Sequence, residues 1–188
     1  MWKRHASKTG DFVPFSDAKE QVRKACERIA LLHYAYASTL TKELGEERGT
    51  QMAMNAIKLY GTLVGQGVRK EVEGQGLPAS AENYGGDLPS YGMSERTESV
   101  KTSEGVAKRV YGCAMAGVWH ELGADALGRI YCYVDPCKFM AYNPDYKLVH
   151  LKAVPDGDEY CEMVVVPTNE HDRAEFAKKD ADLRLLDR

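Results

Sequence analysis

The sequence predicts a single α+β domain: an N-terminal helical hairpin, then an antiparallel sheet of about four strands, in two hairpins, covered by helices. Early stretches repeat apolar residues at steps of three and four, as one face of a helix does. Later stretches alternate with the period of two that is typical of strands. At 188 residues the chain is long enough for one well-buried domain but too short for two full ones.

Residues 16–76 are the predicted helical hairpin. Ser16 is a suitable cap for the first helix, and Gly45 is expected to end it. Gly61 and Gly65 lie inside the second helix, where each glycine costs about 1 kcal/mol relative to alanine. We therefore expect close packing against this face, with a ligand contact as the less favoured alternative.

Composition divides the rest of the chain into four segments. The segments are an N-terminal arm (1–15), a long loop rich in Gly, Pro, Ser and Asn (77–95), the α+β core (96–167) and a charged C-terminal tail (168–188). The loop is either a lid with Tyr84 and Tyr91 as aromatic walls or a plain solvated connection. The tail is predicted to be a surface helix or a partly ordered arm.

Two hairpins with helices between them make up the predicted core. The strands are 97–103, 106–111, 146–154 and 160–166, the last two joined by the turn Pro155-Asp156-Gly157-Asp158. The helices are 113–122 and 124–142, the second interrupted at Pro136.

Composition also argues against several classes of function. The net charge is −3 with both signs mixed along the chain, so nucleic acid is not an expected partner. No apolar run approaches the ~20 residues of a membrane span, and the first residues lack the apolar core of a secretory signal. We therefore expect a cytoplasmic protein whose five cysteines are reduced. No phosphate loop or dinucleotide fingerprint is present, so no cofactor is predicted.

The core holds four of the five cysteines and is the candidate site. Cys113 and His120 are seven residues apart, which would place both on one helix face, and Cys132 and Asp135 are three apart. Alternation places Cys161 on one side of the last strand. If that side faces the helices, all five groups converge there.

Each of these residues also has a structural interpretation. Buried free cysteines such as Cys113 and Cys161 often act as small hydrophobic residues. Asp135 precedes a proline, so it could be the N-cap of the next helix. His120 lies on an amphipathic helix, where a structural role is somewhat more common than a catalytic one.

Two other histidines, His33 and His150, are weaker candidates still. Asp158 is first of all a turn former, because Asp-Gly-Asp side chains hydrogen-bond to the backbone of tight turns.

Three kinds of chemistry would use the cluster. A thiolate could attack an electrophilic carbon, with a His or Asp taking its proton. Alternatively, Asp135 could activate water while a thiol or His protonates the leaving atom. Zinc binding by Cys113, His120, Cys132 and Cys161 is the weakest of the three, because the spacings match no zinc signature.

Three motifs resemble the L-2-amino-thiazoline-4-carboxylic acid hydrolase family of bacteria. They are CAMAGVWHELG, opened by Cys113, LGRIYCYVDPCKFMAYNP, with Cys132, Asp135 and Asn143, and DGDEYCEM, with Asp158 and Cys161. The resemblance extends more weakly to the helical hairpin. The fold is also similar to vinyl-reductase-like ligand-binding domains.

The resemblance implies hydrolytic opening of a small cyclic amidine. Our hypothesis is a small-molecule hydrolase of a non-peptide C–N bond, with self-association through the arm, the tail or the helical hairpin. Its expected catalytic residues are Cys132, Asp135, Cys161 and His120; its expected substrate-binding residues are Cys113, Asn143, Asp158 and Arg129, the last of them for a substrate carboxylate. The alternatives are a non-catalytic ligand- or metal-binding module and a lyase or isomerase acting on a related ring.

Overall fold

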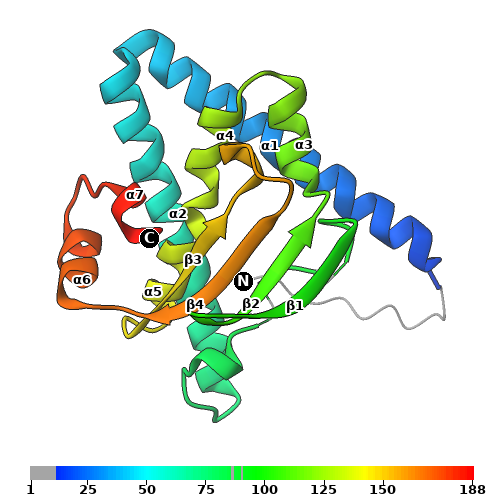
Figure 1. Cartoon of the computed structure of the whole chain (residues 1–188), viewed down its shortest axis with the longest axis vertical. Helices are drawn as coiled ribbons and strands as arrows, with labels where there is room; N and C mark the ends of the chain where they lie inside the picture. Colours follow the sequence, from blue (N-terminus) through cyan, green and yellow to red (C-terminus); the bar gives the residue numbers. More distant parts are fainter. Residues whose placement is uncertain (1–11, 86, 90) are drawn as a thin grey trace.

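The computed structural model describes residues 12–85, 87–89 and 91–188. It confirms the α+β class, since helices gather behind one face of a single four-stranded antiparallel sheet (Figure 1). The strand order is β1-β2-β4-β3. The strands are β1 (Arg96–Thr102), β2 (Gly105–Tyr111), β3 (Tyr146–Lys152) and β4 (Cys161–Pro167).

Two long helices precede the sheet, and shorter ones follow its strands. The α-helices are α1 (Phe15–Leu44), α2 (Glu46–Gly74), α3 (Ala114–Glu121), α4 (Asp125–Cys132), α5 (Val134–Tyr142), α6 (Glu170–Ala177) and α7 (Leu183–Leu186), and the 3-10 turns are η1 (Ala81–Asn83) and η2 (Val154–Asp156).

Gly45 separates α1 from α2 with a φ of 81°, as predicted. Ser16 is not the cap, because Pro14 occupies that position and makes no side-chain cap hydrogen bond.

Pairing of β2 with β4 joins the two hairpins into one sheet. Val110 is opposite Cys161, and His150 of β3 is opposite Met163 of β4. Because side chains alternate along a strand, His150 and Cys161 lie on the same face of the sheet. That face is the one covered by the helices, since His150 contacts Asp135 of α5.

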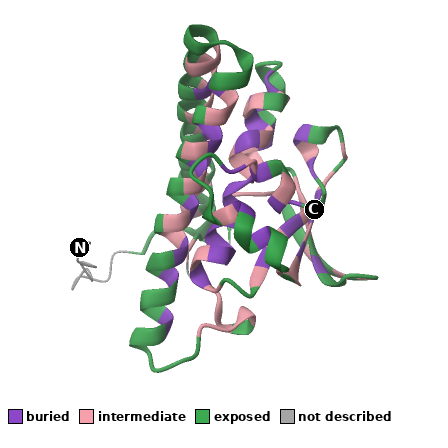
Figure 2. Cartoon of the chain, turned by 90° about the vertical axis from the view of Figure 1, so that its left-hand side faces the viewer, coloured by how far each residue is buried: buried purple, intermediate pink, exposed green. Residues whose placement is uncertain are grey.

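The helix α5 packs directly on α2 at the two glycines. A Cβ atom built on Gly61 would lie 2.7 Å from Cys137 Cβ, and one on Gly65 would lie 2.1 Å from the carbonyl oxygen of Lys138. The predicted close packing is confirmed. Figure 2 shows buried residues concentrated between the long helices and the sheet. The main core cluster contains Ala37, Ala53, Met54, Ile57, Ile130, Tyr133, Val134, Cys137, Met140, Ala181, Leu183 and Leu186.

The predicted interruption at Pro136 is wrong by three residues. The helices α4 and α5 are separated at Tyr133, and Pro136 lies in the first turn of α5. Proline is tolerated there because first-turn N–H groups have no partner within the helix. Asp135 also lies in that first turn, so its interpretation as an N-cap is wrong.

The C-terminal tail is not a surface arm throughout. Leu183 and Leu186 of α7 are 0% exposed and belong to the main core cluster. Polar side chains of α2 hold the preceding segment, since Gln51 donates to the Ala181 carbonyl at 3.1 Å. The tail has too few apolar residues to show a helical period, and its docking depends on this distant partner.

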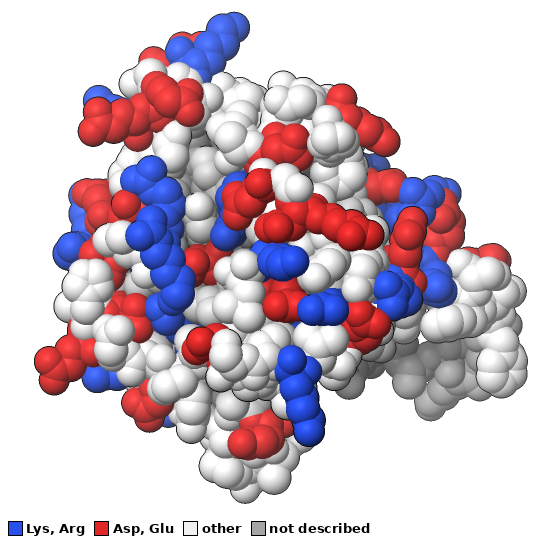
Figure 3. All heavy atoms as spheres, viewed as in Figure 1, with Lys and Arg blue, Asp and Glu red and all other residues white. Residues whose placement is uncertain are grey.

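Charged side chains of both signs are interspersed over the face shown in Figure 3. On the outer face of the sheet, Arg109 pairs with Glu162 at 2.5 Å, and Tyr111 donates to Glu98 at 2.7 Å. In the described part of the chain, no helix is long and apolar enough to cross a membrane.

The glycine contact predicts the effect of a single added methyl group. Replacing Gly65 with Ala should lower the free energy of unfolding by about 1–3 kcal/mol, because the new Cβ overlaps the α5 backbone. Gly67→Ala is the matched control in the same helix: nothing lies within 4 Å, so it should raise stability by about 0.5–1 kcal/mol. Urea unfolding measures both, and equal effects of the two substitutions would contradict the packing.

Candidate functional site

Three of the cysteines converge between α3, α4 and the second hairpin. Cys113 and Cys132 pack with Val154 around the buried residues Ala116 and Trp119. The backbone N–H of Val154 donates to the sulfur of Cys161 at 3.4 Å. The thiol of Cys161 therefore adjoins the cluster that contains the other two, as expected if its strand face meets the helices.

Burial keeps these thiols neutral. It raises the pKa of Cys132 well above the ordinary value, raises that of Cys161 to about 11, and also raises that of Cys113. The negative charge of Asp135 acts in the same direction on all three. A thiolate is the nucleophilic form of cysteine, so these groups are set up as proton donors or as an apolar lining.

Asp135 projects from the first turn of α5 with its side chain 17% exposed. One carboxylate oxygen lies 2.9 Å from Lys138 Nζ, and the other lies 3.5 Å from His150 Nε2. The carboxylate is thus oriented from two sides while part of it remains accessible. An oriented, partly accessible carboxylate of this kind is suited to act as a general base.

Lys138 connects the long loop to the site. Its ammonium group lies 2.9 Å from Asp87, whose carboxylate also accepts from the Tyr84 hydroxyl at 3.1 Å. Burial alone would lower the pKa of Lys138, but the carboxylates of Asp135 and Asp87 and the Tyr84 hydroxyl raise it overall. The lysine is therefore charged although it is buried.

The loop is anchored on α5 at this point. The Tyr84 ring stacks on Phe139 with centroids 4.0 Å apart, and Tyr142 donates to the Ser80 carbonyl at 2.9 Å. Tyr84 is thus an aromatic wall beside Lys138. Tyr91 instead packs edge-on against Phe15 of α1, with centroids 5.3 Å apart.

Sequence reasoning ranked His150 low and did not identify Asp187, although both lie beside Asp135 and Arg129. The imidazole, 3% exposed, lies between Asp135 at Nε2 and Asp187 at Nδ1, the latter 3.1 Å away. Strand alternation placed His150 on one face of its strand, but nothing marked that face as the site. Asp187 had no local signal, because its partner lies 37 residues away in the sequence.

Arg129 is also held by carboxylates. Its Nε donates to Asp156 at 2.8 Å and its Nη2 to Asp187 at 2.7 Å. Its positive charge lowers the pKa of both Cys132 and Cys161, which places the guanidinium near the thiols, although burial outweighs this effect. Among the described residues, Nη1 of Arg129 is one of two buried polar side-chain atoms without a hydrogen-bond partner.

His120 does not join the cluster. Its side chain is 79% exposed and lies 3.3 Å from Asp125. The prediction that Cys113 and His120 share one helix face is wrong, because Cys113 precedes α3 as its N-cap. The buried face of α3 is formed by Ala116 and Trp119.

Asn143 and Asp158 support the backbone around the site. Asn143 donates to the Ala79 carbonyl at 2.7 Å and accepts from the Asp145 N–H at 2.8 Å, so it joins the long loop to the end of α5. Asp158 accepts from the Ala153 N–H at 2.9 Å, as expected of a turn former. The turn leading into Cys161 is fixed in this way.

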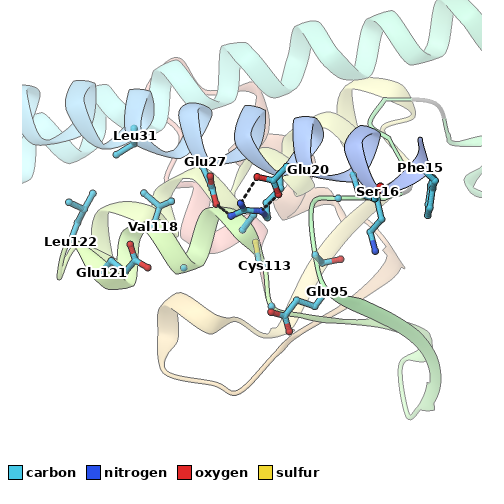
Figure 4. Close-up of a pocket in the computed structure, with 17 residues that line it drawn as sticks. Phe15, Ser16, Glu20, Glu27, Leu31, Glu95, Cys113, Val118, Glu121 and Leu122 are labelled. Carbon is cyan, nitrogen blue, oxygen red and sulfur yellow. Dashed lines mark hydrogen bonds and ion pairs between the residues drawn. The ribbon is translucent and has the colours of Figure 1, made fainter. Parts of the chain in front are cut away.

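A groove of about 1050 Å³ runs between α1 and α3 (Figure 4). Cys113 lies in its wall, whereas Cys132, Asp135 and Cys161 do not line it. Figure 4 shows the Cys113 sulfur directed toward α1. Arg23 of α1 lines the groove and is paired along the same helix with Glu20 at 2.8 Å and with Glu27. The groove therefore brings solvent to Cys113.

No group of three or more His, Cys, Asp or Glu side chains in the described part of the chain is arranged to hold a metal ion.

Comparison with known proteins gives one match. Residues 23–165 match the family described as L-2-amino-thiazoline-4-carboxylic acid hydrolase. No curated protein and no solved structure matches significantly. The matched range contains Cys113, Cys132, Asp135 and Cys161 and covers well over half of the 188 residues. The chain therefore belongs to the L-2-amino-thiazoline-4-carboxylic acid hydrolase family.

Proposed function

We propose that the protein hydrolyses a C–N or C–S bond at the amidine carbon of a small cyclic amidine or thiazoline-like substrate. The family description supports this class of substrate. The observation that carries the mechanism is a cluster of desolvated, protonated thiols whose pKa values are raised further by the charge of one oriented carboxylate, Asp135.

In this mechanism Asp135 is the general base. Lys138 and His150 hold its two oxygens in place, and its 17% exposure leaves part of the carboxylate accessible to water. Asp135 takes one proton from water as the water oxygen bonds to the amidine carbon. Positioned bases of this kind contribute roughly 10²- to 10⁴-fold to the rate.

Cys132 is the general acid in the same step. The ring bond from the amidine carbon breaks, and the departing nitrogen or sulfur takes the proton of the Cys132 thiol. The thiol is then restored by the proton that Asp135 removed from water, so the net reaction adds one water molecule. Burial keeps the resting Cys132 protonated, which is the form that a general acid requires and not the form that attacks as a nucleophile.

Arg129 is the proposed anchor for a substrate carboxylate. Two of its nitrogens are occupied by Asp156 and Asp187, which fix the guanidinium, and Nη1 is the donor left for a ligand. A charge-assisted hydrogen bond from Nη1 would satisfy this buried donor.

The experiment is turnover of a panel of cyclic amidines, thiazolines and hydantoins. Cys132→Ser and Asp135→Asn should each lower kcat by roughly 10²- to 10⁴-fold, because each removes one proton-transfer group. His120→Ala is the matched control and should retain wild-type activity, since this exposed side chain lies outside the cluster.

Full activity in both site variants would contradict the assignment. Saturable binding of the panel by the wild type without turnover would instead identify a binding module.

We further propose self-association through the helical hairpin. An apolar groove of about 380 Å³ lies between α1 and α2, bordered by Ile29, Leu32, Tyr36 and Tyr60, which are 38–67% exposed. Exposed apolar patches of this kind often mark interfaces, and a second copy of the chain presents the same patch.

Leu32→Glu should shift the protein to a smaller species in light scattering coupled to size-exclusion chromatography, because it places a charge in that interface. Val106→Glu, at a 67% exposed position of the sheet, should not. A wild-type protein that is monomeric at all concentrations would overturn the proposal.

A further inference from the structure

The second-to-last residue of the chain reaches the centre of the site. The Asp187 side chain is 0% exposed, and the residue lies outside the family match at 23–165. It follows α7, which Leu183 and Leu186 anchor in the core. The C-terminal segment therefore delivers a carboxylate to His150 and Arg129.

Each oxygen of Asp187 has its own donor. Oδ1 accepts from the backbone N–H of His150 at 2.8 Å, and Oδ2 accepts from Arg129 Nη2 at 2.7 Å. His150 Nδ1 lies 3.2 Å from Oδ1 and 3.1 Å from Oδ2. Burial alone would raise the pKa of Asp187, but the hydrogen bonds from His150 and the charge of Arg129 lower it overall.

Stability alone does not call for a carboxylate here. The apolar residues of α7 already bury the segment, and a buried ion pair is often no more stabilising than an apolar replacement of similar size. What Asp187 adds is orientation, because an acceptor at Nδ1 selects one tautomer and one ring position.

The ring held in this way faces the proposed base. His150 Nε2 lies 3.5 Å from Asp135, whose other oxygen is bound to Lys138 of α5. We propose that Asp187 is a positioning residue of the site, which orients His150 so that the imidazole relays protons to and from Asp135. This role rests on the proposed hydrolysis.

The relay conserves protons. Asp135 takes a proton from the attacking water and passes it to Nε2 of His150, while the Nδ1 proton stays hydrogen-bonded to Asp187. The imidazolium formed is flanked by both carboxylates. After the ring bond breaks, Nε2 returns the proton through Asp135 to Cys132, which has protonated the departing atom.

The first test needs no substrate. In protein labelled with ¹⁵N-histidine and assigned with His150→Gln, Nδ1 of His150 should carry a proton in the resting wild type and Nε2 should carry none, because Nε2 has to accept the proton from Asp135. In Asp187→Asn, the amide NH₂ donates to Nδ1, so the proton should move to Nε2. Asp182→Asn keeps a capping side chain at the start of α7, away from His150, and should leave the tautomer unchanged. A wild-type ring without a proton on Nδ1, or with protons on both nitrogens, overturns the proposal whether or not the variant folds.

The second test uses turnover. Asp187→Asn should lower kcat roughly 10- to 100-fold, as loss of an orienting partner does. KM should rise as well, because Asp187 also holds Arg129, the proposed substrate anchor. Asp187→Glu should recover part of that loss. The double variant with His150→Gln should be no slower than His150→Gln alone, whereas additive losses would show that Asp187 acts independently. If the wild type turns over no cyclic amidine, the proposed function fails. The tautomer of His150 would still show whether Asp187 orients the ring, because that test uses no substrate.

Discussion

Pairing of buried charges around α5 determines how the other elements meet at the site. Lys138 and Asp135 lie one turn apart on this helix, and each needs an opposite charge because neither is well solvated. Asp87 of the long loop and His150 of β3 supply further partners. Removing one member of such a pair typically costs about 3–5 kcal/mol, since the other charge stays buried. The loop, the sheet and α5 are therefore held in one arrangement.

The close approach of α5 to α2 places that charged turn in the interior. Gly61 and Gly65 allow the two backbones to touch, and the contact at Gly65 involves the carbonyl of Lys138 itself. The thiols of Cys113 and Cys132 are desolvated by a different contact, their packing around Ala116 and Trp119 of α3. Their protonated state thus follows from helix packing, and it is the state that the proposed acid role of Cys132 requires.

Much of the fold could be predicted from the sequence because its signals are local. Apolar periods located the long helices, alternation located both hairpins, and the glycines indicated helix packing. The convergence of the cysteines followed from the same reasoning. The pairing of His150 with Asp187 could not be predicted, because it joins a strand to the chain end without any local pattern. His120 was misplaced because helical spacing applies only inside a helix, and Cys113 lies just before it.

The central claim is that Cys132 works as a neutral thiol beside a carboxylate base. The most direct test is the rate of its alkylation by iodoacetamide as a function of pH, followed by mass spectrometry with Cys132→Ser as the assignment control. A raised pKa leaves little thiolate at neutral pH, so the rate should rise about tenfold per pH unit between about pH 7 and pH 9 without levelling off. A plateau already reached near pH 7 would show a preformed thiolate and contradict the account.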